Sequence, residues 1–179
     1  MAGGGVPDPI EVFCRLGGAL DVEDLVVVAD EIMNRMTGDE ERIRAVVLER
    51  IAVLRRTGAV RLVRAARLAR RGSRSPAETR VRLVLEAAGV PRPELDAPIH
   101  EPLTGAYRGS PDFVWRKQRV LLEYEGEHHR LDEAQFRYDI VRYDDLTAAG
   151  RRVLRATGHD LSKDGRTRLA QRVARALSA

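Results

Sequence analysis

The spacing of apolar residues changes after Gly89, and this change limits the fold of the 179-residue chain more than any other feature. Before Gly89, apolar residues recur every three or four positions, which is typical of one buried helix face. After residue 97, short β-branched and aromatic runs alternate with turn residues, which is typical of strands. The sequence therefore predicts a small all-helical N-terminal region followed by an α/β domain.

We expect residues 1–8 to form a flexible lead-in, residues 9–72 the helical region and residues 73–179 the second domain. Gly72-Ser73-Arg74 is the expected linker, because glycine and serine favour irregular backbone. The expected helices of the first region cover residues 9–17, Asp21 through Met36, a segment after the capping box Thr37–Glu40, and about 59–71.

In the second domain, strands 112–115 and 120–125 are joined by a turn at 116–119, which predicts an antiparallel hairpin. A helix over 132–149 joins the second of these strands to another at 152–156, which predicts a right-handed crossover. The two pairings together predict a mixed sheet. The remaining expected elements are a helix from Ser75 to about Ala88, a weak strand at 97–101, loops at 104–110 and 126–130, and a basic helix over 161–177.

Three carboxylates mark the hairpin as the candidate site. If the turn is centred on Lys117-Gln118, Asp112 faces Glu123 across the hairpin, at the roughly 4.5–5.5 Å between Cβ atoms that opposed residues have. The two-residue period of a strand places Glu125 on the same face as Glu123. We therefore expect these three acidic side chains to converge.

Converging carboxylates repel each other unless a cation neutralises them. Ligands that are all oxygen favour Mg²⁺ or Mn²⁺ over zinc, and such a metal polarises a phosphate and activates water. The alternative is that one or more of these acids points to solvent or pairs with an arginine. On the first interpretation, Asp112 and Glu123 are the metal ligands.

Other candidate residues each have a structural alternative. His129 can accept a proton from an attacking water or hold a phosphate, or it can be a solvated loop side chain. Arg142 can clamp a phosphate while Asp139 holds it in place, or the two can form a surface ion pair. Glu78 can act in a catalytic site, although its capping box with Ser75 accounts for it equally well.

The positive charge of the chain is mostly arginine. The net charge is +4 and the sequence pI is about 9.7, and 29 of the 31 basic residues are arginines. Arg64, Arg67 and Arg71 are expected on one helix face, where they form either a solvated surface or contacts to DNA phosphates. Tyr107 is a candidate for stacking on bases, whereas Trp115 is expected to pack in the core.

Some classes of protein are excluded or disfavoured by composition. The single cysteine, Cys14, rules out a disulfide within the chain and a cysteine-rich zinc site. The sequence contains no run of 18 consecutive apolar residues, which a membrane span would require. The N-terminus lacks the basic and apolar segments of a secretory signal. We therefore expect a cytoplasmic protein with no membrane partner.

An ordered series of motifs resembles a known family. The motifs are Ser75–Arg82, Ala88–Pro93, Pro111–Trp115, Glu123–Arg130, Asp139–Arg142 and Val153–Arg155. Together, over residues 73–162, they resemble an actinobacterial domain family related to very-short-patch-repair endonucleases, within the PD-(D/E)xK restriction-endonuclease-like superfamily. Residues 8–72 are similar to the helical region that often precedes this domain.

The resemblance implies a restriction-endonuclease-like αβββαβ core and a metal-dependent DNA phosphodiesterase site. By motif, Asp112 and Glu123 would bind the metal, Glu125 would stand where the superfamily usually has lysine, and Glu78 would be the acid of the first core helix. His129 would be a base or phosphate contact, Arg130 and Arg142 would bind DNA, and Asp139 would support them. The zinc-binding cysteines of very-short-patch-repair enzymes are absent, so no zinc is expected.

Three functions remain open at this level. The first is an endonuclease that uses Mg²⁺ or Mn²⁺ to hydrolyse DNA. The second is a DNA-binding or regulatory protein that keeps a nuclease-like core without catalysis, for example in a toxin–antitoxin or phage-defence system. The third is a small protein-interaction module built on the helical region. The first is the leading hypothesis because of the acidic cluster that precedes His129.

Overall fold

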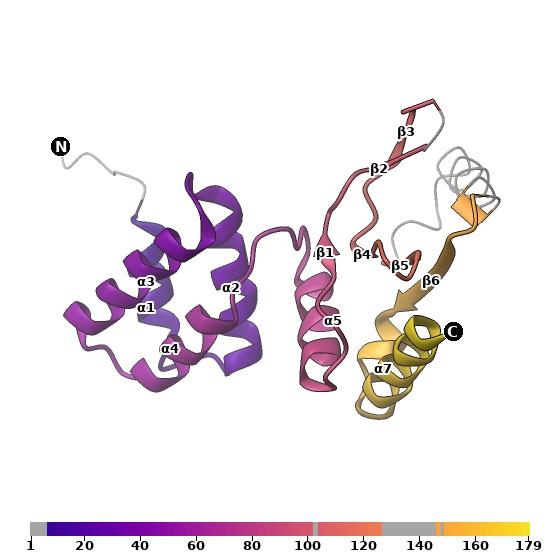
Figure 1. The fold of residues 1–179 in the computed structure, drawn as a ribbon. Coiled ribbons are helices and arrows are strands. Elements are labelled where there is room, and N and C mark those ends of the chain that lie inside the picture. The colour runs from indigo at the N-terminus through magenta and orange to yellow at the C-terminus, as the bar shows by residue number, and fades with distance from the viewer. Residues whose placement is uncertain (1–6, 102–103, 127–145, 148) are drawn as a thin grey trace. The chain divides into compact units, whose positions relative to one another are not determined.

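The structure of the protein is a computed structural model that describes residues 7–101, 104–126, 146–147 and 149–179 (Figure 1). The chain divides into two compact units, Met1–Thr79 and Arg80–Ala179. Each unit is described by itself below. Among the described residues, no helix combines the length and apolar character needed to cross a membrane.

The first unit contains the four expected helices, α1 (Pro9–Leu16), α2 (Val22–Arg35), α3 (Glu40–Leu54) and α4 (Ala59–Leu68). Three of them begin at an aspartate whose side chain accepts a backbone N–H of the first turn, and these caps are Asp8, Asp21 and Asp39. The helices bury one apolar core, which includes Phe13, Leu25, Met33, Ile43 and Leu62.

The end of α4 differs from the expected helix over 59–71. The helix ends at Leu68, because Ala69 adopts an extended conformation with ψ 139°. The chain beyond it is held by α2 instead. The buried Asp30 carboxylate accepts Arg70 N at 2.8 Å and Thr79 Oγ1 at 2.8 Å. Arg70 N thus bonds to Asp30, and Arg71 N bonds to Glu40 Oε1 at 2.9 Å, in place of helical carbonyls.

The expected linker at 72–74 is also bound to the first unit. Asn34 on α2 accepts Gly72 N at 2.9 Å and donates to the Ser73 carbonyl at 2.6 Å. The boundary between the units falls after Thr79, several residues later than the expected boundary at 72/73. It lies within α5 (Pro76–Ala87), whose first residues bond to α2.

The second unit is built on a mixed four-stranded sheet with the order β1-β4-β5-β6. The strands are β1 (Glu94–Leu95), β4 (Phe113–Trp115), β5 (Val120–Glu125) and β6 (Arg152–Thr157). The β4–β5 pair is antiparallel and the β5–β6 pair is parallel, as expected. A short 3-10 helix η2 (Gly158–Leu161) leads from β6 into α7 (Lys163–Ser178). The mixed α/β class after N-terminal helices is therefore confirmed.

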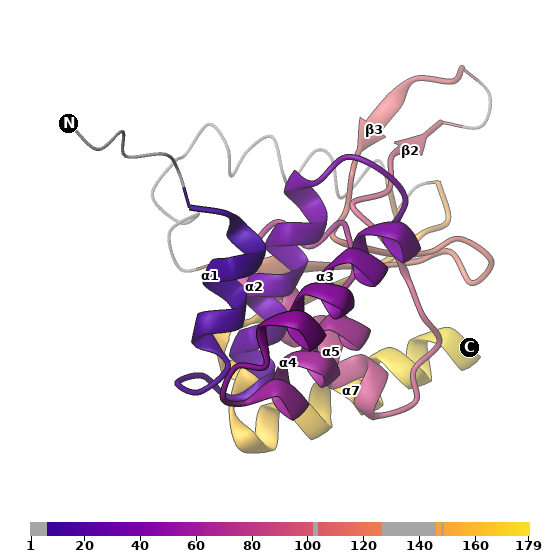
Figure 2. The same ribbon diagram turned by 90° about the vertical axis from the view of Figure 1, so that its left-hand side faces the viewer.

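The expected strand at 97–101 lies outside this sheet. Its residues Ile99–His100 form β2, which pairs with β3 (Tyr107–Gly109) in a separate two-stranded sheet that projects from the unit in both views (Figures 1 and 2). The main sheet instead gains β1. Asp96 has φ +46° and its N–H donates to the Asp112 carbonyl, so the chain turns away between β1 and β2. The expectation of a loop at 104–110 is wrong for the β3 residues.

The two faces of the sheet carry different side chains. One face packs Phe113, Trp115, Val120 and Leu122 into a core with residues of α5 and α7. The other face carries Val114 and Leu121, which pack with Ala97, Ile99 and Leu146. Because strand residues alternate, Glu123 and Glu125 share this second face with Leu121. The expected helix over 132–149, and with it the hand of the crossover, lies mostly outside the described residues.

Candidate metal and nucleic-acid site

The register of the hairpin agrees with the turn predicted at 116–119. Phe113 pairs with Leu122 and Trp115 pairs with Val120. The same register, continued by one residue, opposes Asp112 to Glu123 at the end of the hairpin. The predicted hairpin register is therefore confirmed for residues 113–115 and 120–122, and the opposition of the two acids follows from continuing it.

Asp112 is half-buried and already binds the backbone of the neighbouring strand. Its Oδ2 accepts Tyr124 N at 2.7 Å, just beyond the last paired residue of β4. This bond satisfies a backbone donor of β5 that the β4 ladder does not reach. It also holds the Asp112 carboxylate against β5, beside the position of Glu123.

Glu123 is buried, with 7% of its surface exposed. A buried carboxylate is costly unless charges or hydrogen bonds compensate it. The parallel β5–β6 register places Arg155 directly beside Glu123. A positive residue from the next strand therefore adjoins the acidic end of the hairpin.

Glu125 forms an ion pair with the same arginine. The distance from Arg155 Nε to Glu125 Oε1 is 3.0 Å, and both side chains are partly exposed. Within the described part of the chain, no three His, Cys, Asp or Glu side chains form a group that could hold a metal ion. The expected convergence of three carboxylates is therefore corrected to an opposed pair, Asp112 and Glu123, with Glu125 engaged by Arg155.

Sequence analysis did not single out Arg155 as a site residue. The signal that could have identified it was available, because the expected parallel pairing of strands 120–125 and 152–156 puts an arginine next to the acids. The missing information was the register of that pair. A parallel pair has no tight turn from which the register can be derived.

Four of the expected site residues lie outside the described residues. These are His129, Arg130, Asp139 and Arg142, all within residues 127–145. Their proposed roles stay predictions.

Glu78 acts as a helix cap in the first unit. Its carboxylate accepts Arg74 N at 2.7 Å and the Ser75 hydroxyl at 2.8 Å, while Ser75 Oγ accepts Glu78 N at 3.2 Å. This is a variant of the expected capping box, in which the Glu78 carboxylate binds the N–H of Arg74 and the Ser75 hydroxyl. The bonds account for Glu78 without a catalytic role.

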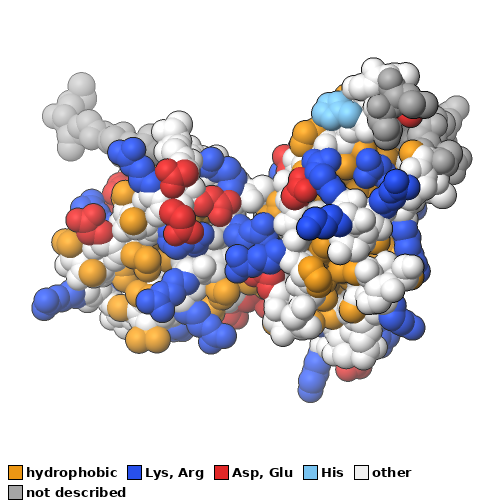
Figure 3. Space-filling view, viewed as in Figure 1, with side chains coloured by type: hydrophobic (Ala, Val, Ile, Leu, Met, Phe, Trp, Pro, Cys, Tyr) orange, Lys and Arg blue, Asp and Glu red, His pale blue; other side chains and the backbone are white. Residues whose placement is uncertain are grey.

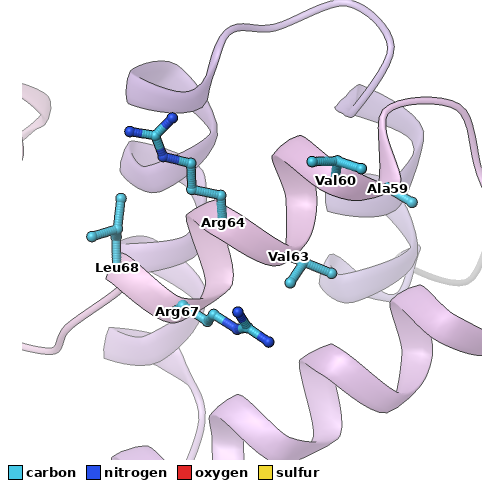
Figure 4. Close-up of a pocket in the computed structure, with 6 residues that line it drawn as sticks. All are labelled: Ala59, Val60, Val63, Arg64, Arg67 and Leu68. Carbon is cyan, nitrogen blue, oxygen red and sulfur yellow. The ribbon is translucent and has the colours of Figure 1, made fainter.

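Arg64 and Arg67 are exposed on α4, where they line a hollow of about 530 Å³ (Figure 4). The other lining residues are apolar and come from the same helix, and they include Val60 and Leu68. Figure 4 shows the two guanidinium groups extending to opposite sides of α4. Neither side chain forms an ion pair or hydrogen bond within the part of the chain that the structure describes.

Arg71 does not share the α4 face, contrary to expectation, because it lies beyond the end of the helix. Its guanidinium donates to the carbonyls of Met33 at 2.9 Å, Met36 at 2.5 Å and Gly38 at 3.1 Å. These carbonyls lie at and beyond the C-terminal end of α2, where helical partners are lacking. Arg71 therefore has a structural role in capping α2.

The two aromatic candidates differ in exposure. Trp115 is buried in the core and its Nε1 donates to the Pro91 carbonyl at 2.6 Å, as expected for a core residue. Tyr107 on β3 is 61% exposed and contacts the His100 ring edge-on, with 5.8 Å between ring centroids. Tyr107 therefore remains accessible for stacking.

Two known proteins are similar to part of this chain. The chain is 33% identical over 103 residues to the uncharacterized proteins MT2308 and Rv2248 of Mycobacterium tuberculosis, from two strains. The matched region is 58% of this chain and 37% of each relative, so the chain spans little more than a third of their length. No protein-family description and no solved structure matches the chain.

Proposed function

We propose that the protein is a cytoplasmic endonuclease that uses Mg²⁺ or Mn²⁺ to hydrolyse DNA. The observation that carries the proposal is the β4–β5 register, whose continuation by one residue opposes Asp112 to Glu123, together with the bond from Tyr124 N that holds the Asp112 carboxylate against β5. Mg²⁺ in enzymes is usually held by one or two carboxylates together with waters and a substrate phosphate. Two opposed oxygen ligands therefore suit this ion when DNA supplies the rest.

The reaction is a phosphodiester hydrolysis. A water attacks phosphorus, one bridging P–O bond breaks, and the products are a phosphate monoester and an alcohol. The metal supplies charge neutralisation and a more acidic water when it is bound. Asp112 and Glu123 would hold it, and the water's proton passes to His129 or to a carboxylate of the cluster. Arg155 holds the Glu125 carboxylate beside them through an ion pair of 3.0 Å.

Cleavage of plasmid DNA tests the proposal. The informative variants are Asp112→Asn and Glu123→Gln, because the asparagine keeps an oxygen that can accept Tyr124 N while the ligand charge is lost. We expect each variant to lose about 100-fold or more in cleavage rate, as electrostatic groups of active sites usually do. EDTA should abolish cleavage by the wild type.

The matched control is Asp164→Asn on α7, which removes a carboxylate from the same unit. Asp164 is exposed in the first turn of α7, away from the hairpin in sequence, and its loss should leave cleavage unchanged. Unchanged cleavage in both Asp112→Asn and Glu123→Gln would refute the proposed site.

A second candidate is a DNA-binding or regulatory protein without catalysis, for example in a toxin–antitoxin or phage-defence system. It is favoured by the engagement of Glu125 with Arg155, and by Arg64 and Arg67 on α4. It predicts salt-sensitive DNA binding that survives both EDTA and Asp112→Ala. Metal-dependent cleavage would exclude this candidate.

A further inference from the structure

A group of positive side chains lies at the end of the sheet where β5 and β6 begin. The β4–β5 turn supplies Lys117 and Arg119, and the start of β6 supplies Arg151 and Arg152. Arg152 N donates to the Arg119 carbonyl at 2.8 Å, so the turn and the start of β6 are held side by side. We call these four side chains the turn patch.

The turn patch has no acidic partner in the described part of the chain. A fifth cation of the same turn, Arg116, is neutralised by Glu94 and donates to the Pro98 carbonyl at 3.1 Å. The four patch side chains, by contrast, make neither an ion pair nor a hydrogen bond with any described residue. In Figure 3, Lys and Arg side chains gather on the visible face of the second unit.

Backbone hydrogen bonds determine the positions of Arg119 and Arg151. Arg119 has φ +56°, a left-handed conformation that closes the turn, and its N–H donates to the Arg116 carbonyl at 3.2 Å. Arg151 N donates to the Leu146 carbonyl at 3.0 Å. The patch is therefore anchored on bonded backbone at the edge of a sheet.

The positive charges of the patch repel each other. The pKa of Arg151 is lowered by its burial and, beyond that, by the charges of Arg116 and Arg119. This places three guanidinium groups within electrostatic reach of one another. Binding of an anion would relieve this repulsion, which water only weakens.

We propose that the turn patch binds phosphates of the DNA backbone, an inference that rests on the proposed endonuclease function. Arginine is suited to phosphate because its planar fork donates two parallel hydrogen bonds. Glu123 is four residues along β5 from Arg119, about 13 Å at the usual rise per strand residue. That is the axial rise of about four base pairs, so one duplex can contact the patch and the acidic pair together.

The test is the salt dependence with which a short DNA duplex binds in EDTA, where no cleavage occurs. The variant is Arg119→Gln with Arg151→Gln, and the control is Lys163→Gln with Arg175→Gln on α7, which changes the net charge equally. We expect the patch variant to reduce the slope of log K against log salt by about 1.8, or about 0.9 per lost phosphate contact. The control should keep the wild-type slope.

A melting temperature equal to that of the wild type establishes that the patch variant is folded. Arg119→Lys with Arg151→Lys should regain most of the slope, because the charge is restored. Equal slopes for the patch variant and the control would overturn the inference, as would absence of DNA binding by the wild type. Loss of slope in the patch variant without cleavage by the wild type in Mg²⁺ would support the patch while refuting the endonuclease.

Discussion

At the scale of single residues, arginines of similar sequence context have different roles. Arg67 is exposed on α4, whereas Arg71 donates to three carbonyls at and beyond the end of α2. Sequence alone does not separate them, because both fall within the helix expected over about 59–71. The difference arises where Asp30 binds Arg70 N and diverts the chain from the helix.

We predict that Arg71→Ala lowers the free energy of unfolding by about 2 kcal/mol, because hydrogen bonds from a charged group contribute about 1.5–3 kcal/mol. Arg67→Ala should change it by less than about 0.5 kcal/mol, as exposed substitutions usually do. Urea denaturation followed by circular dichroism measures both. Equal stabilities of the two variants would contradict the capping role of Arg71.

Cys14 makes the stability of the first unit depend on pH. Its thiol is buried in α1, and this burial raises its pKa above the ordinary value of 9.0. The unfolded chain therefore loses this proton at a lower pH than the folded chain. It follows that the free energy of unfolding falls as the pH rises above the unfolded pKa.

The expected result is a lower free energy of unfolding at about pH 10 than at about pH 8, with a smaller pH dependence in Cys14→Ala. Urea denaturation at the two pH values measures this difference. Comparison with the alanine variant, which lacks only the thiol, cancels the contributions of all other titratable groups. A pH dependence that is the same with and without the thiol would contradict the burial effect.

At the scale of elements, the α3–α4 turn depends on one glycine. Gly58 has φ +83°, and a Cβ atom placed there would lie 1.9 Å from the Gly17 carbonyl oxygen. The end of α1 and the start of α4 therefore approach each other backbone to backbone. Neither the positive φ nor the contact tolerates a side chain.

We expect Gly58→Ala to destabilise the protein by about 3 kcal/mol or more, since backbone strain and overpacking each cost about 1–3 kcal/mol. The control is Gly38→Ala, which also has a positive φ, +118°, but open space around the position of Cβ. It should cost about 1 kcal/mol. Thermal denaturation compares the two, and equal losses would show that the contact with Gly17 has no energetic weight.

Elements whose ends are marked by local chemistry were predictable. The start near Asp21 and the turn at 116–119 define a helix start and the hairpin register in the sequence itself. The third helix was expected to begin with a capping box from Thr37 to Glu40, but its cap is Asp39, two residues later than Thr37. The strand β1 was not predictable, because its two residues carry no strand pattern and depend on pairing with β4. The same holds for β3, which depends on β2.

At the scale of the whole molecule, the second unit places opposite charges at the two ends of β5. Asp112 and Glu123 lie toward the end of the strand, and the turn patch lies at its beginning. The acidic end could be predicted from the sequence because a hairpin register determines it. The basic end could not, because it requires the parallel β5–β6 register that brings Arg152 beside Arg119.

The central claim is that Asp112 and Glu123 hold a divalent cation, and calorimetric titration with Mn²⁺ in the presence of a short DNA duplex tests it most directly. The wild type should bind the ion, and Asp112→Asn with Glu123→Gln should not. Glu125→Gln should retain binding, because Arg155 already engages that carboxylate. Equal binding by the wild type and the double variant, or no binding by either, would contradict the claim.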